Sequence, residues 1–216
     1  MKRFTFILAA GFGLTGCYGN LATFQPARTM SAGGFAIGAE GSGIGVASDA
    51  GDKHQGTFSI AGRYAVTNRV EIGARVGTTR PEIMAKFRLD QGKPGVTAIS
   101  FAPSVGAFPA TATGIFAWNT YGQLPVLVGI PLGRHELVFG GALQFGHAVN
   151  LERAGWGLAM GPSASVAFVA QPVKWLSILP TFALAMPFFH AGPLGASTSD
   201  ALSYQLGLAV FAGKLH

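Results

Sequence analysis

In the stretch Val70-Glu71-Ile72-Gly73-Ala74-Arg75-Val76, apolar side chains alternate with charged residues or glycine. In an extended strand, successive side chains point to opposite faces, so the apolar residues at even numbers share one face. Glu71 and Arg75 lie on the other face. A strand with one apolar and one charged face is typical of a barrel wall that has lipid outside and polar groups inside.

The segments before and after this stretch repeat the alternation. Their apolar faces carry Phe58, Ile60 and Tyr64 in the first, and Ile83, Ala85, Phe87 and Leu89 in the second. Their opposite faces carry Thr57, Ser59 and Arg63, and then Glu82, Met84, Lys86 and Arg88. Three consecutive segments with the same two faces predict neighbouring strands of one sheet.

About ten such segments follow one another along the chain. The remaining ones begin near Phe35, Ile99, Phe116, Leu137, Trp156, Ile178 and Leu202. An even number suits a closed barrel whose two ends lie on the same side of the membrane. The sequence therefore predicts an all-β fold, a closed antiparallel transmembrane β-barrel of about 10 strands (8 to 12) that follows an N-terminal signal peptide.

The connections between these segments alternate in length. Short turns are predicted at residues 67–69, 91–95, 131–133 and 171–173. Longer loops are predicted at residues 48–55, 103–113, 148–155 and 190–200, and only the connection at 78–81 is short among them. Outer-membrane barrels have short periplasmic turns and long extracellular loops, so this alternation favours the same arrangement.

The composition points in the same direction. Charged residues make up 11% of the chain, hydrophobic residues 49%, and the mean hydropathy is +0.40. No apolar run after the first residues reaches the length of about 18 that a membrane helix needs. A rival interpretation is a lipid-anchored soluble β-barrel, which would place its large apolar residues inside.

The N-terminus carries the marks of an export signal. Lys2 and Arg3 precede an apolar stretch, and Leu14-Thr15-Gly16-Cys17 resembles the lipobox of bacterial lipoproteins. The resemblance implies that Cys17, the single cysteine, becomes the first mature residue and carries acyl chains such as palmitate. We therefore expect a signal peptide at 1–16, a tether at 17–32 and a barrel at 33–216, anchored by lipid at Cys17 on the periplasmic side of the outer membrane.

Residues 33–216 resemble bacterial outer-membrane β-barrel proteins as a class. The resemblance implies two partners, the lipid bilayer and the outer-membrane assembly machinery, and leaves any protein partner unknown. Such barrels usually end on an aromatic residue in the last strand. Here the strand pattern of residues 202–211 is followed by Gly213-Lys214-Leu215-His216, which departs from that ending.

The inward faces of the early strands gather most of the charge. The predicted lumenal cluster consists of Arg63, Glu71, Arg75, Glu82, Lys86 and Arg88, and Glu40 is a further candidate. One interpretation is a network of salt bridges that satisfies buried charges. The other is a narrow, porin-like pore with a weak preference for anions, because basic side chains outnumber acidic ones in this set.

Histidines near the predicted long loops raise the question of catalysis. His54, His147 and His190 lie near Asp49, Asp52, Ser197, Ser199 and Asp200, but at no spacing that matches a catalytic or metal-binding motif. We therefore expect no catalytic residue, no metal and no cofactor. The modest charge also predicts no nucleic-acid partner.

The expected function is a structural element or small passive channel. The alternatives are a surface-binding barrel that uses its long loops, and a lipid-modifying enzyme with a rim histidine.

Overall fold

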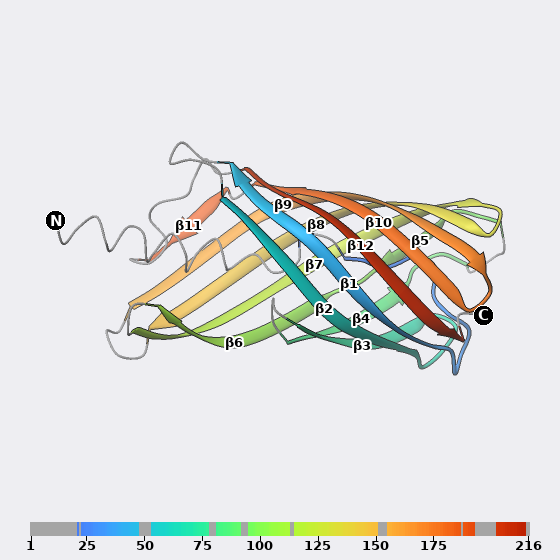
Figure 1. Cartoon of the computed structure of the whole chain (residues 1–216), viewed down its shortest axis with the longest axis horizontal. Helices are drawn as coiled ribbons and strands as arrows, with labels where there is room; N and C mark the ends of the chain where they lie inside the picture. Colours follow the sequence, from blue (N-terminus) through green and yellow to red (C-terminus); the bar gives the residue numbers. More distant parts are fainter. Residues whose placement is uncertain are drawn as a thin grey trace.

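The computed structural model describes residues 21, 23–47, 53–77, 81–91, 95–112, 115–150, 155–186, 188–192 and 202–214. These residues form one sheet of twelve strands (Figure 1). The strands are β1 (Phe35–Ala47), β2 (Lys53–Ala65), β3 (Val70–Gly77), β4 (Glu82–Arg88), β5 (Ala98–Phe101), β6 (Ser104–Ala112), β7 (Ile115–Leu132), β8 (His135–Asn150), β9 (Gly155–Val173), β10 (Leu176–Ala185), β11 (Phe189–Ala191) and β12 (Leu202–Lys214).

The sheet closes on itself. Strand β1 pairs with both β2 and β12, and β12 pairs in turn with β10, which returns to β9. Each of these pairings is antiparallel. Strands β5 and β6 lie one after the other between β4 and β7, and β10 and β11 both pair with β9, so the wall consists of ten passes. The prediction of a closed antiparallel barrel of about ten strands is confirmed.

The predicted connections are correct in part. The chain turns at residues 67–69, where the Val66 amide donates to the Val70 carbonyl at 2.9 Å. The loop predicted at 103–113 is wrong, because residues 104–112 form β6 and pair with β7 along their whole length. Small residues and Pro109 hide the alternation in that segment. The next turn lies at Gly133 and Arg134, later than predicted, and Gly133 adopts the positive φ of 67° that glycine tolerates.

The two faces of the wall differ as the alternation predicted. Ile37, Phe58 and Ile83 are 60%, 52% and 65% exposed on the outside. On the inside, Glu71 and Arg75 are each 1% exposed. The rival soluble barrel would require the opposite distribution, so it is wrong, and the apolar outer surface suits the hydrocarbon core of a bilayer. None of the described residues belongs to a helix long and apolar enough to cross a membrane.

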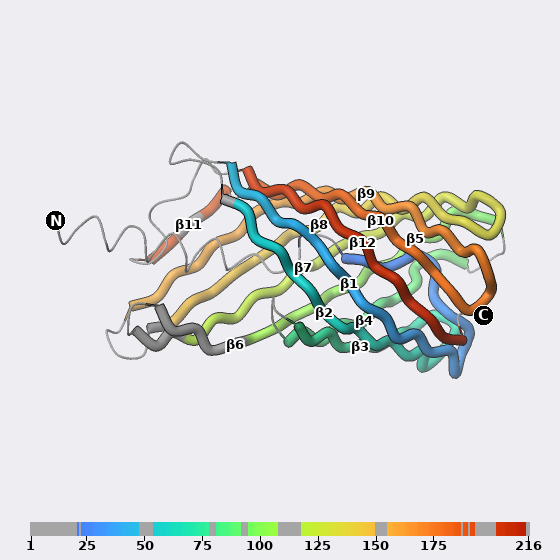
Figure 2. Tube along the Cα trace, in the orientation of Figure 1, coloured from blue at the N-terminus to red at the C-terminus, as the bar shows by residue number. Residues whose placement is uncertain are grey.

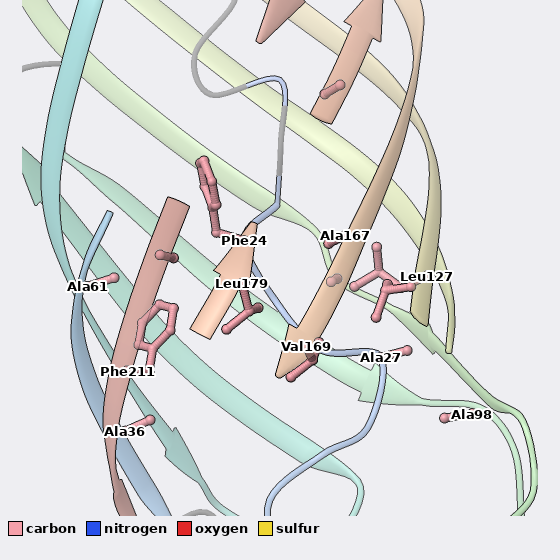
Figure 3. Packing of buried hydrophobic residues seen from close by; sticks show 14 of the residues in the cluster. Phe24, Ala27, Ala36, Ala61, Ala98, Leu127, Ala167, Val169, Leu179 and Phe211 are labelled. Carbon is pink, nitrogen blue, oxygen red and sulfur yellow. The ribbon is translucent and has the colours of Figure 1, made fainter. Parts of the chain in front are cut away.

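The interior contains a segment that the sequence did not assign to it. Residues 21–32, apart from the undescribed residue 22, run without regular secondary structure inside the barrel, as the blue trace in Figure 2 shows. Leu21, Phe24, Ala27 and Met30 are at most 4% exposed. In Figure 3, Phe24 and Ala27 lie among inward-facing residues of the wall such as Leu179. The stretch expected to be a tether therefore fills the lumen from Leu21 to Met30, apart from the undescribed residue 22, whereas Ser31 and Ala32 are exposed. We call residues 21–32 the plug segment.

The plug segment runs toward the end of the barrel that carries the short turns. At its start, Gln144 Nε2 of β8 donates to the Leu21 carbonyl at 3.5 Å. Near its end, Thr29 Oγ1 donates to the carbonyl of Asn68 in the turn between β2 and β3, at 2.6 Å. The Ala32 amide also donates to Asn68 Oδ1 at 2.7 Å. The plug segment then leads directly into β1.

Candidate functional site

One group of buried charges lies around Arg75. Strand pairing sets Arg75 opposite Glu82, and their Nη1 and Oε2 atoms lie 2.8 Å apart. On the other side, Arg75 Nη2 donates to Glu40 Oε1 at 3.2 Å, and Nε forms an ion pair with the other oxygen of Glu40. The three side chains are 1–2% exposed. One guanidinium thus bridges two carboxylates from β1 and β4.

A second group lies around Glu71. Pairing of β3 with β4 sets Glu71 opposite Lys86, with 2.8 Å between Oε2 and Nζ. Arg63 Nη1 on β2 lies 3.7 Å from the same carboxylate oxygen. The guanidinium carbon of Arg63 also lies 4.6 Å from the centre of the Phe211 ring, within the range of a cation–π contact. Two cations, Arg63 and Lys86, thus share the single carboxylate of Glu71 inside the wall.

Both groups bind the backbone of the plug segment. Arg75 Nη2 donates to the Thr23 carbonyl at 3.2 Å. Lys86 Nζ donates to the carbonyls of Pro26 and Arg28 at 3.3 and 2.8 Å, and Glu71 accepts from the Met30 amide. An irregular backbone has no ladder to satisfy its polar groups, and such groups need partners when they are buried. The lumenal charges supply those partners.

The wall also makes room for the plug segment. A Cβ atom added at Gly207 of β12 would lie 2.5 Å from Phe24 Cζ, and one at Gly129 would lie 2.8 Å from Ala27 Cβ. Phe24 has a φ of 45°, a left-handed conformation that bulky residues rarely adopt. Such a conformation persists only where the surroundings determine it. Wall and segment are therefore closely fitted to each other.

The structure brings five of the six predicted cluster residues together, and Glu40 joins them. Arg88 lies apart, because its Nε pairs with Asp90 Oδ1 at 2.7 Å. Two further charged residues belong to the lumen. Glu136 of β8 is 3% exposed, and its Oε1 lies 4.0 Å from Nε of Arg28 in the plug segment. Glu136 directly precedes the alternating run that begins at Leu137, and this alternation predicts that Glu136 points inward. No alternation around Arg28 predicts its position.

The charge balance of the lumen differs from the one expected. In the described part of the wall, the buried charged residues are four acidic and three basic ones: Glu40, Glu71, Glu82, Glu136, Arg63, Arg75 and Lys86. The plug segment contributes Arg28 as a fourth cation. With the plug segment in place these charges balance, and without it the wall has an acidic excess. This composition does not support the anion preference that the sequence suggested.

The residues behind the other sequence hypotheses lie elsewhere. His54 on β2 is exposed and its Nδ1 lies 3.2 Å from the Tyr204 hydroxyl, His147 lies on β8, and His190 lies on β11. Cys17 and the loop residues Asp49, Asp52, Ser197, Ser199 and Asp200 lie outside the described residues. Among the residues that the structure describes, no group of three or more histidine, cysteine, aspartate or glutamate side chains is arranged to hold a metal.

The sequence matches no protein-family model and no curated protein. The structure is similar to Neisserial surface protein A, with a TM-score of 0.48 and 10% identity over 82% of this chain and 96% of that one. It is also similar to the attachment invasion locus protein Ail of Yersinia pestis, with a TM-score of 0.41 and 9% identity over 84% of this chain and 99% of that one. A third similar structure is the outer membrane protease OmpT from Escherichia coli, with a TM-score of 0.38 and 8% identity over 90% of this chain and 98% of that one. Similarities this low say nothing about activity, and the fold of this chain rests on its own strand pairings.

Proposed function

We propose that the protein is an outer-membrane β-barrel lipoprotein with a structural role, and that its own plug segment closes its lumen. The observation that carries the proposal is the burial of Leu21, Phe24, Ala27 and Met30 inside the barrel, on a segment whose backbone binds Arg75, Lys86 and Glu71. Of the two roles predicted from the sequence, the structural element is favoured over the passive channel, because ions would have to displace a bound segment.

Catalysis is not part of this proposal. The buried charges bind one another and the plug backbone, so they are not presented to a substrate. His54, the exposed histidine with a described partner, contacts a tyrosine hydroxyl and no described carboxylate or serine. A general base needs a reacting group within hydrogen-bond reach and a partner that orients it, and the described part of the rim offers no such pair.

Ion flux through liposomes tests the closed lumen. Reconstituted wild-type protein is expected to leave flux at the background of protein-free liposomes, because the plug segment and its ion pairs occupy the lumen. The measurement is dissipation of a potassium gradient, with heat-dependent gel mobility as proof that the protein is folded. Steady conductance from folded wild-type protein would contradict the closed barrel and restore the channel interpretation.

Substitution of the lipidation site separates the anchor from the barrel. Cys17→Ala is expected to abolish palmitate labelling and slow assembly, yet leave the protein in the membrane, because the apolar outer wall holds it there. The measurements are metabolic labelling with palmitate, the time taken to reach the heat-modifiable form, and fractionation after alkaline extraction. Complete release of the variant into the soluble fraction would show that the wall does not span the membrane.

A further inference from the structure

A small cavity lies where the plug segment meets the wall near the short turns. Its volume is about 40 Å³. The plug segment contributes Pro26, Arg28, Thr29 and Met30, and the wall and turns contribute Arg63, Arg134, Glu136, Val169, Gln171 and Ser177. Arg134, in the turn between β7 and β8, is exposed, so the cavity has an edge that solutes reach from outside the barrel.

The cavity carries an excess of positive charge. Three arginines line it, Arg28, Arg63 and Arg134, against the carboxylate of Glu136 in the lining and that of Glu71, whose Oε2 lies 3.7 Å from Arg63 Nη1. Nε of Arg28 lies 4.0 Å from Oε1 of Glu136, too far for a hydrogen bond between the two side chains, and the Glu136 carboxylate accepts instead from the backbone amides of Arg28 and Ala27. The neighbouring Ser177 adds a hydroxyl from the start of β10. The cavity thus combines charge with hydrogen-bond donors.

Two of these guanidinium groups have buried donors that the described protein does not satisfy. Arg63 is 6% exposed, and its Nε has no hydrogen-bond acceptor among the described residues. Nη2 of Arg28 is buried and likewise has no acceptor within the described part of the chain. Buried charged donors are nearly always paired, because leaving them unpaired is unfavourable. They therefore point to a ligand that accepts hydrogen bonds and carries negative charge.

We propose that this cavity binds one phosphate-class oxyanion, which joins the plug segment to the wall. Guanidinium groups match the oxygens of phosphate in geometry as well as charge. The volume corresponds to about three water molecules at 10–15 Å³ each, which is the scale of a single tetrahedral oxyanion. Free inorganic phosphate and the terminal phosphate of a lipid headgroup share this chemistry. The site requires the plug segment to be seated, because Arg28 belongs to it.

The test measures binding to folded, full-length mature protein whose liposome flux has first been shown to be at background. Potassium phosphate is compared with potassium chloride at equal ionic strength, and the readout is the midpoint of the heat-dependent gel mobility change. A second arm omits inorganic phosphate and compares vesicles of phosphatidylcholine alone with vesicles that also contain phosphatidic acid. We expect phosphate, phosphatidic acid or both to raise the midpoint in a saturable manner.

Two variants connect the effect to the cavity. Arg134→Gln removes an exposed lining charge and is expected to weaken binding about tenfold, the size of one charge-assisted hydrogen bond. Lys174→Gln removes a positive charge from the turn between β9 and β10, outside the cavity lining, and should bind like wild type. The proposal is overturned if neither phosphate source raises the midpoint of closed protein, or if both variants respond equally. Flux from wild-type protein before the test would instead refute the closed barrel, so the two failures are distinguishable.

Discussion

Deletion of residues 21–32 is expected to turn a closed barrel into one that conducts ions. The deletion removes the four buried apolar residues Leu21, Phe24, Ala27 and Met30, together with the backbone carbonyls that Arg75 and Lys86 bind. Water then fills the space between polar wall residues. Ion flux in reconstituted liposomes should rise at least about tenfold above the protein-free background, as a water-filled lumen lined by charge permits.

The flux should favour cations weakly. The wall that remains has four buried acidic residues against three basic ones in its described part. Reversal potentials under a potassium chloride gradient measure this preference. Lys174→Gln, which alters an exposed turn and leaves the plug segment intact, serves as the control and should stay at background. If the deletion variant is folded by heat-dependent gel mobility but remains impermeable, the plug segment is not what closes the barrel.

Arg75→Met is expected to cause the largest loss of stability of any single substitution discussed here. It leaves the carboxylates of Glu40 and Glu82 buried at about 2% exposure without their shared cation. Removing one partner of a buried ion pair costs about 3–5 kcal/mol in the free energy of unfolding. Urea titration of the reconstituted protein, followed by gel mobility, measures the change.

A compensating variant distinguishes loss of charge pairing from loss of packing. Arg75→Met combined with Glu40→Gln and Glu82→Gln removes all three charges together and should recover most of the stability. Arg88→Met breaks the separate pair with Asp90, whose side chains are 11% and 12% exposed, and should cost less than Arg75→Met. Equal stability of the single and the compensated variants would show that the ion pairs do not stabilise the barrel.

The wall of the barrel was predictable because its signal is local. Alternation from Val70 to Val76 assigns each side chain to a face, and the burial of Glu71 and Arg75 follows from the period of a strand alone. The prediction failed at residues 104–112, where small residues leave no contrast between the two faces. Those residues form a strand because β7, already set by its own pattern, offers them a partner.

The lumenal charges were predictable as a set but not as a network. That Arg63, Lys86 and Glu71 point inward is a property of each strand. That Glu71 lies opposite Lys86, and that Arg75 also reaches Glu40 across β2, depends on the register between strands. Register is set by the turns that join neighbouring strands and by the matching of their apolar faces, so no single segment contains it.

The sequence by itself determined the barrel, its two faces and the inward position of its charges, because side chains alternate with a period of two in any strand. Only the tertiary structure decided that the described part of the plug segment fills the lumen as far as Met30. An irregular segment has no repeating pattern to mark it as buried, and each of its residues meets a different part of the wall. Phe24 lies against Gly207, and Arg28 lies beside Glu136. These contacts exist only once the closed sheet has enclosed a space that the plug segment can fill.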